Sequence, residues 1–173
     1  MPMPADHELS ILLLKPFGRA DFNQVCKIYE EGIATGLATF ETKVPNWDTW
    51  NQAHLESCRI AAWRDEEMLG WAALSPVSGR CVYGGVAEVS LYIAESARGQ
   101  GIGRHLLQAL VDASEQAGLW TLQAGIFPGN LASIRVHEQC GFRKVGYREK
   151  IGKHNNEWRD TVLMERRSTR IGV

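Results

Sequence analysis

A glycine-rich turn, Arg98-Gly99-Gln100-Gly101-Ile102-Gly103, lies in the middle of this 173-residue sequence. It follows a segment that alternates like a strand, 86–94, and precedes a segment with helical periodicity from Ile102 onward. The start of a helix exposes unpaired backbone N–H groups and the positive end of the helix dipole. Glycines let that backbone approach an anion closely, and Arg98 and Arg104 add positive charge at the edges. The turn therefore predicts a site for phosphate or pyrophosphate.

Two common phosphate-binding loops do not match this turn. A nucleotide-hydrolysing P-loop carries a Lys-Ser or Lys-Thr pair after its last glycine, where this chain has Arg104-His105. A dinucleotide-binding loop needs a third glycine where this chain has Arg104, and it lies near the start of a βαβ unit with an acidic residue about twenty positions on. On the turn alone, glycines that only shape a tight strand-to-helix connection stay an open alternative.

The rest of the sequence predicts a single domain, 1–173, with its core over about residues 9–167. Strands are expected where short apolar or alternating runs occur, and helices where apolar residues recur every three or four positions. The fold class is α/β with a mixed sheet, because the 86–94 strand crosses through a helix to a parallel neighbour. The expected strands are 9–15, 59–64, 68–74, 86–94, 119–126, 143–151 and 158–166, the last two joined by a turn over 153–156. Helices are expected after Asp21, from Asn46 or Asp48 to about Ser57, from Ile102 to the capping Gly118, and over 130–140 before Gly141.

Composition and charge exclude several classes of protein. The net charge is −1 and 45% of the residues are hydrophobic, so neither nucleic-acid binding nor a disordered chain is expected. The four cysteines form no C-x-x-C pair and no zinc spacing, so we expect free thiols and no metal. Residues 1–10 lack the pattern of a secretion signal, and no apolar run is long enough to span a membrane. The expected location is the cytoplasm, without a membrane partner.

Two motifs resemble the GNAT superfamily of acyltransferases. The Arg-x-x-Gly-x-Gly pattern of the turn is similar to the acyl-coenzyme A loop of that family. The segment 130–142, from Asn130 to Gly141-Phe142, is similar to the family's helix beside the thioester end of the coenzyme. The resemblance extends from about Leu12 to Glu165. It implies the GNAT fold, a central mixed sheet flanked by helices, and acetyl-coenzyme A (acetyl-CoA) as co-substrate.

A narrower resemblance concerns the acceptor. The segments 80–93, 38–41 and 153–160 are similar to those of phosphinothricin and methionine sulfoximine N-acetyltransferases, whereas the loop 75–79 departs from them in length and sequence. The resemblance implies acetyl transfer to the amino group of a small amino-acid-like acceptor, and a homodimer.

Glu88 is the candidate general base. An α-ammonium group has a pKa near 8, so a base must take a proton before the amine attacks a thioester. Glu88 lies on the polar set of the 86–94 strand with Ser90 and Tyr92, where we expect partial burial to raise its pKa. The alternative is a solvated strand glutamate.

His137 is the second catalytic candidate. It occupies the position where many superfamily members carry a tyrosine that protonates the leaving thiolate, and histidine can act as an acid or help to relay the proton. The resemblance also implies a catalytic part for histidine here. The alternative is a helix histidine that only packs or caps.

The remaining site residues bind the two substrates. Arg80 can pair with a carboxylate in bidentate fashion, although an exposed loop arginine is the alternative. The resemblance implies contacts with the coenzyme by Leu91, Tyr92, Ile93, Arg98, Gly99, Gln100, Gly101, Ile102, Gly103, Arg104, Asn130 and Ser133, and contacts with the acceptor by Phe40, Arg80, Tyr83, Glu88, Ser90 and Tyr92.

Two other functions stay open on the sequence. One is acetylation of peptide or protein N-termini, which needs an open groove instead of a carboxylate clamp. The other is a non-catalytic sensor that binds coenzyme A, against which the presence of Glu88 and His137 argues.

Overall fold

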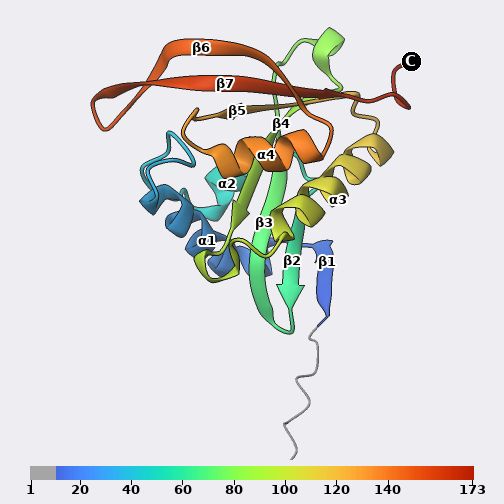
Figure 1. The fold of residues 1–173 in the computed structure, drawn as a ribbon. Helices are drawn as coiled ribbons and strands as arrows, with labels where there is room; N and C mark the ends of the chain where they lie inside the picture. Colours follow the sequence, from blue (N-terminus) through green and yellow to red (C-terminus); the bar gives the residue numbers. More distant parts are fainter. Residues whose placement is uncertain (1–10) are drawn as a thin grey trace, which may run out of the picture.

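The fold is a mixed α/β arrangement in a computed structural model that describes residues 11–173 (Figure 1). Two expectations, on a secretion signal in residues 1–10 and on a strand that starts at Leu9, lie outside the described residues. Over the described residues the sheet has seven strands in the order β1-β2-β3-β4-β5-β7-β6, and β4 and β5 form its one parallel pair. The strands are β1 (Leu12–Pro16), β2 (Ile60–Arg64), β3 (Glu67–Pro76), β4 (Val86–Ile93), β5 (Thr121–Ile126), β6 (Arg143–His154) and β7 (Glu157–Arg167). This mixed sheet confirms the predicted fold class.

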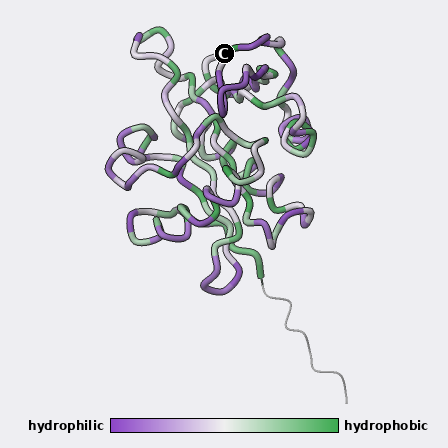
Figure 2. The backbone as a smooth tube through the Cα atoms, turned by 90° about the vertical axis from the view of Figure 1, so that its left-hand side faces the viewer, coloured by the Kyte–Doolittle hydropathy of each residue, from purple (hydrophilic) through white to green (hydrophobic). Residues whose placement is uncertain are grey.

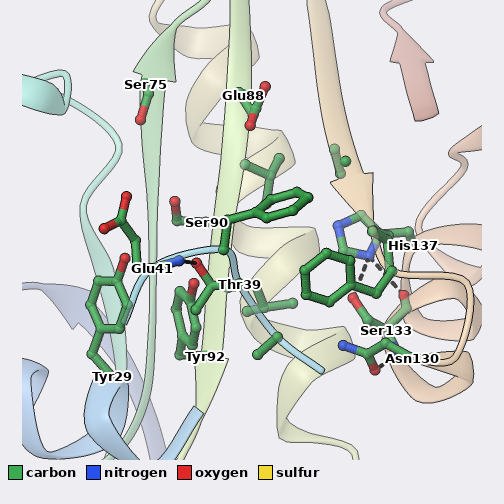
Figure 3. Close-up of a pocket in the computed structure, with 18 of the residues that line it drawn as sticks. Tyr29, Thr39, Glu41, Ser75, Glu88, Ser90, Tyr92, Asn130, Ser133 and His137 are labelled. Carbon is green, nitrogen blue, oxygen red and sulfur yellow. Dashed lines mark hydrogen bonds between the residues drawn. The ribbon is translucent and has the colours of Figure 1, made fainter. Parts of the chain in front are cut away.

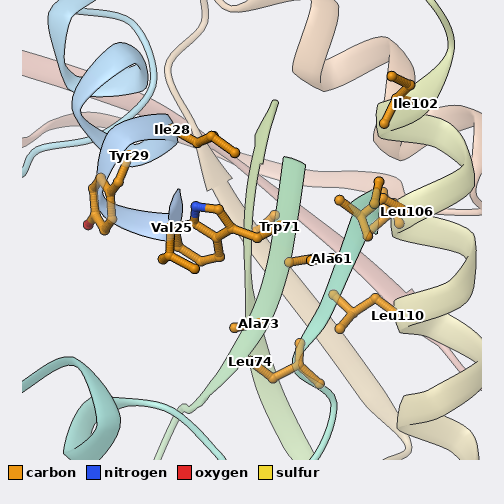
Figure 4. Packing of buried hydrophobic residues seen from close by; sticks show 14 of the residues in the cluster. Val25, Ile28, Tyr29, Ala61, Trp71, Ala73, Leu74, Ile102, Leu106 and Leu110 are labelled. Atoms are coloured by element: carbon orange, nitrogen blue, oxygen red, sulfur yellow. The ribbon is translucent and has the colours of Figure 1, made fainter. Parts of the chain in front are cut away.

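Helices cover both faces of the sheet. They are α1 (Phe22–Ala34), α2 (Trp47–Ala53), α3 (Ile102–Gln116) and α4 (Leu131–Gln139). In Figure 4, α1 lies on one side of β3 and α3 on the other. Among the helices of residues 11–173, none is both long and apolar enough to cross a membrane.

The core follows the predicted periodicity of the two long helices. The buried face of α1 includes Val25, Ile28 and Tyr29, and that of α3 includes Leu106 and Leu110 (Figure 4). Hydrophilic stretches gather in the outer loops of the molecule (Figure 2). Burying these apolar side chains on both faces of one sheet stabilises this layered arrangement.

Aromatic side chains fill the α1 face of the core. Trp71 on β3 is fully buried and stacks on Tyr92 of β4 with ring centroids 4.9 Å apart. Tyr29 of α1 stacks on Tyr92 in turn, at 4.7 Å. Because alternate residues of a strand share a face, Ser90 and Glu88 lie on the same face of β4 as Tyr92.

The second helix is shorter than predicted. It begins at the cap Asn46, whose Oδ1 accepts a hydrogen bond from the backbone N–H of Thr49 at 2.9 Å, but it ends at Ala53 instead of Ser57. The buried guanidinium of Arg59 donates to the carbonyl oxygens of Asn51, His54 and Leu55 at 2.7–3.3 Å. These carbonyls therefore bond to a side chain instead of to a further helical turn.

The last two strands form a longer hairpin than predicted. Both Asn155 and Asn156 have positive φ, 49° and 64°, and they alone make the turn, so β6 runs on to His154 and β7 begins at Glu157. A two-residue turn with left-handed residues matches the twist of a hairpin, which explains why the predicted four-residue turn over 153–156 is wrong.

Candidate active site

The site lies where β4 and β5 part. The two strands pair in parallel over three positions, Val86 with Thr121, Ala87 with Leu122, and Glu88 with Gln123. Beyond these pairs β4 stays with β3 as far as Ile93, and β5 stays with β7. Among residues 11–173, the second half of β4 therefore has one edge without a neighbouring strand, and its backbone groups there are available to bind a ligand.

Two adjoining cavities meet beside this edge. The larger has a volume of about 670 Å³ and the smaller about 340 Å³. Several residues of the second half of β4, of the 35–45 loop and of the start of α4 line both cavities. These shared residues are Ala38, Leu91, Tyr92, Asn130 and Ser133.

The larger cavity contains the predicted glycine turn. Gly99 and Gly101 have positive φ, 76° and 78°, and a Cβ added to either would meet nothing within 4 Å. Gly101 is the N-cap of α3 and provides no side chain to bond the first N–H groups of the helix. Arg98 and Arg104 also line this cavity. Free N–H groups, a helix start and two cations together fit an anionic group such as a pyrophosphate.

The other predicted coenzyme residues fall into two groups. Leu91, Tyr92, Ile93, Ile102 and Gly103 line the larger cavity. The side chain of Gln100 does not line it, because its amide donates to the Ser96 carbonyl oxygen at 3.2 Å and its Oε1 accepts from Arg64 at 3.4 Å.

The side chain of Asn130 already has partners within the protein. Its Oδ1 accepts from the Ser133 N–H at 3.2 Å as the cap of α4, and its Nδ2 donates to the Leu37 carbonyl oxygen at 3.2 Å. It thus ties the start of α4 to the loop that shapes both cavities.

The smaller cavity contains both predicted catalytic residues. Figure 3 shows Glu88 beyond Ser90 and Tyr92 along β4, with His137 of α4 on the other side of the cavity from Ser90. The Glu88 side chain is exposed, so the expected partial burial of this carboxylate is wrong. One of its oxygens, Oε2, accepts a hydrogen bond from Gln123 Nε2 at 2.9 Å.

His137 is held in one orientation and one tautomer. Its side chain is buried, and Nδ1 lies 2.7 Å from the carbonyl oxygen of Ser133, one turn earlier in α4. A carbonyl only accepts, so Nδ1 carries the proton and Nε2 is an unprotonated acceptor. Burial lowers the pKa of His137 below its ordinary value, so the ring is neutral at pH 7. Nε2 is buried without a hydrogen-bond partner in the described chain.

Two predicted acceptor residues lie outside the cavity lining. Arg80 precedes a short 3-10 turn, Cys81–Tyr83, of which Tyr83 is the last residue; both side chains are exposed, with the guanidinium over the tyrosine ring at 5.5 Å. Phe40 and Ser90, by contrast, line the smaller cavity. Within one chain, the structure brings together Glu88, His137, Phe40, Ser90 and Tyr92 but not Arg80 and Tyr83.

Sequence reasoning missed five polar residues that line the smaller cavity: Tyr29, Thr39, Glu41, His54 and Ser75. Burial and the nearby Glu41 carboxylate raise the pKa of Tyr29, so its hydroxyl stays protonated. Burial lowers the pKa of His54, whose Nδ1 lies 2.7 Å from the Trp50 carbonyl oxygen. Thr39 and Glu41 belong to the segment 38–41 that carries the narrower resemblance, whereas Tyr29 and His54 have no local signal beyond helical spacing.

Comparison with known proteins identifies the family. Residues 24–142 match the family described as "Acetyltransferase (GNAT) family", so the chain belongs to the GNAT acetyltransferases. It is an acetyl-CoA-dependent N-acetyltransferase of that family.

Within the family, its curated relatives include enzymes that act on amino-acid analogues. The chain is 36% identical over 153 residues to a phosphinothricin N-acetyltransferase of Alcaligenes faecalis, which covers 84% of this chain and 77% of that protein. It is 30% identical over 161 residues to an L-methionine sulfoximine/L-methionine sulfone acetyltransferase of Pseudomonas paraeruginosa, covering 88% of this chain and 92% of the relative.

A solved structure gives the same picture. A GNAT superfamily phosphinothricin acetyltransferase from Sinorhizobium meliloti, in complex with acetyl-CoA, superposes with a TM-score of 0.82 at 26% identity and covers 93% of this chain and 90% of that one. The predicted GNAT fold and the resemblance to this group of enzymes are both confirmed.

Proposed function

We propose that this enzyme transfers the acetyl group of acetyl-CoA to the amino group of a small amino-acid-like acceptor, of the phosphinothricin, methionine sulfoximine or methionine sulfone type. The observation that carries the proposal is the pair of adjoining cavities: one contains the glycine turn, and the other contains Glu88 and His137. The names of the relatives support the acceptor class.

The larger cavity is assigned to the coenzyme. The N–H groups of the turn between Gly99 and Arg104 bind the pyrophosphate. The free edge of β4 at Leu91, Tyr92 and Ile93 binds the pantetheine arm through backbone hydrogen bonds, as it would bind an added strand. Backbone groups supply most of these bonds. The thioester then lies where the two cavities share their lining, close to Tyr92 and Ser133.

Glu88 takes the proton that the acceptor must lose. The carboxylate accepts it from the ammonium group, directly or through a water, and the neutral amine attacks the thioester carbonyl carbon. A C–N bond forms, the C–S bond breaks with its electron pair on sulfur, and the thiolate takes up a proton to leave as coenzyme A. Because Glu88 is exposed in the free enzyme, its carboxylate is accessible to the acceptor.

His137 takes a more limited part than a simple acid. Its Nε2 carries no proton in the resting enzyme, so it accepts a hydrogen bond from the amine or from a water. It can give a proton to the departing thiolate only after it has received one. A relay role therefore fits the observed tautomer better than direct donation.

Arg80 and Tyr83 are assigned to the acceptor's carboxylate. Arg80 has no ion pair among the described residues, and its guanidinium is ordered only by the ring of Tyr83. The turn that carries them leads directly into β4, two residues before the strand begins. Phe40 packs edge-on against Phe127 at 4.8 Å and provides an apolar wall for the acceptor side chain.

A thiol-release assay tests the function. Acetyl-CoA is combined with phosphinothricin, methionine sulfoximine, methionine sulfone, the ordinary amino acids and a set of short peptides. Turnover of a free amino-acid analogue well above that of every peptide supports the proposal. Turnover of peptides alone means an N-terminal acetyltransferase, and acetyl-CoA binding without thiol release for any amine means a sensor.

We further propose a homodimer in the cytoplasm. The β6–β7 hairpin at the sheet edge exposes several large apolar side chains, with 43–60% of their surface accessible: Val145, Tyr147, Ile151 and Trp158. Such a patch on an edge is suited to pairing with a second copy. The four cysteines are all free thiols, which suits a reducing compartment.

A further inference from the structure

A row of polar residues crosses the sheet at the level of the proposed base. Ser75 on β3 lies opposite Glu88 on β4, which lies opposite Gln123 on β5. Gln123 in turn lies opposite Glu165 on β7, and Glu165 lies opposite Arg143 on β6. Residues opposite each other on neighbouring strands project to the same face, so five strands contribute to one polar row.

Gln123 stands between two carboxylates in this row. The outer one, Glu165, is paired with Arg143 at 2.9 Å. The inner one, Glu88, accepts a hydrogen bond from the side-chain amide of Gln123 at 2.9 Å. Glu165 therefore has its ion pair with Arg143, and the amide N–H of Gln123 donates its hydrogen bond to Glu88.

The position of this bond matters for the reaction. Glu88 and Gln123 form the last residue pair before β4 and β5 separate, so the carboxylate lies where the two strands diverge. Because Glu88 is exposed, little packing restrains its side chain, and the Gln123 amide is its one side-chain hydrogen-bond partner within residues 11–173. The bond engages Oε2 and leaves Oε1 for the acceptor.

We propose that Gln123 is a positioning residue that orients the Glu88 carboxylate where β4 and β5 part. The amide donates to Oε2 of the carboxylate and so holds this otherwise exposed side chain at the last pair of β4 and β5, with Oε1 left for the acceptor. This inference rests on the proposed function of Glu88 as base.

Replacement of Gln123 by isosteric methionine removes the donor and keeps the volume. We expect kcat to fall about tenfold through misplacement of the base, while the KM for acetyl-CoA stays unchanged. Gln123→Lys supplies another donor at the same position and should recover part of kcat, again with an unchanged KM for acetyl-CoA.

Gln108→Met is the matched control. Gln108 also donates its amide to a carboxylate, Asp112 at 3.1 Å, but on the exposed face of α3 and outside both cavities. Its replacement should leave kcat and KM unchanged. A second measurement needs no turnover: the side-chain carboxyl ¹³C resonance of Glu88, assigned by its loss in Glu88→Gln, should change its chemical shift at fixed pH in Gln123→Met but not in Gln108→Met.

The outcomes separate the two hypotheses. Wild-type enzyme that releases no thiol with any amine defeats the proposed function. Active wild-type enzyme whose kcat and Glu88 ¹³C chemical shift coincide with those of Gln123→Met overturns the positioning role. The role is also overturned if Gln123→Lys lowers kcat as much as Gln123→Met does, because restoring a donor would then have no effect.

Discussion

His137 Nδ1 lies 2.7 Å from the carbonyl oxygen of Ser133, and this one bond leaves the other ring nitrogen as a buried acceptor. The ring is enclosed by α4 itself and by Phe142, whose ring packs edge-on at 5.0 Å. A neutral histidine with a fixed tautomer is a defined chemical group, so its role can be tested by replacing each nitrogen separately.

Replacement of His137 by asparagine retains a donor near the Nδ1 position and removes Nε2. We expect kcat to fall by about 10²-fold, as for the loss of a proton-transfer group, with only a small loss of thermal stability. His137→Gln, whose amide reaches the Nε2 position, should recover part of the rate. Full turnover with an unchanged pH profile in both His137→Asn and His137→Ala would contradict a functional role.

Glu88→Gln should lower kcat at pH 7 by about two to four orders of magnitude. The deficit should shrink as the pH rises above the acceptor's ammonium pKa of about 8, because the amine then arrives without its extra proton. Thermal unfolding should be almost unchanged, since Glu88 is exposed. The proposed role is wrong if thiol release by this variant stays close to the wild-type rate at pH 7.

Gly101→Val should raise the KM for acetyl-CoA more than the KM for the acceptor. Gly101 has φ 78°, so a β-branched residue there strains the backbone by about 1–2 kcal/mol and disturbs the N–H groups of the turn. Gly101→Asn, which tolerates this conformation, separates the strain from the side chain that it adds to the cavity. Gly79→Val is the control, because Gly79 lacks a positive φ and a Cβ there meets nothing within 4 Å. Equal KM values in all three variants would exclude the turn from the coenzyme site.

Glu115 anchors the C-terminal segment. Its replacement should make the free energy of unfolding depend less on pH in the acidic range. The Glu115 carboxylate accepts hydrogen bonds from Ser168 Oγ at 2.8 Å and from the Arg166 guanidinium at 3.0 Å, and Arg170 forms an ion pair with it. These donors, Ser168 first, hold the pKa of Glu115 below its ordinary value. The stabilisation is therefore present above the unfolded-state pKa of about 4.3 and is lost as the pH falls through the lower folded-state pKa.

The measurement is denaturant unfolding of wild type and Glu115→Gln between pH 3 and pH 8. The variant should be less stable by about 1–3 kcal/mol at pH 7, and the gap should narrow only below about pH 4.3. A gap that stays constant down to pH 3 would mean that the hydrogen bonds to the carboxylate do not depend on its charge.

Trp158→Ser combined with Ile151→Ser should shift the protein from dimer to monomer. Both side chains lie on the exposed β6–β7 hairpin, with 57% and 53% of their surface accessible, and an apolar patch of this kind is the proposed interface. Sedimentation velocity measures the change. Leu13→Ser, on the opposite edge of the sheet, should leave the dimer intact. A wild-type protein that sediments as a monomer would defeat the proposed interface.

Local sequence patterns predicted most of the fold. The period of α1 and α3, the alternation along β4 and the glycines that end helices all appear as expected, because each depends on residues close in the chain. The errors at α2 and the last hairpin have distant or subtle causes. Arg59 lies six residues beyond the last residue of α2, Ala53, and the left-handed turn at Asn155 and Asn156 has no glycine to mark it.

The sequence by itself determined the family, the anion-binding turn and the two catalytic candidates, because the glycine turn and the α4 motif are each contiguous. Tertiary structure alone decided what surrounds them. The pairing of β4 with β5 sets Gln123 against Glu88, and packing around α4 buries His137, whereas the tautomer of that ring follows from a bond to Ser133 one turn earlier in the same helix. Burial and contacts between strands depend on side chains brought together from distant segments, so no local pattern encodes them.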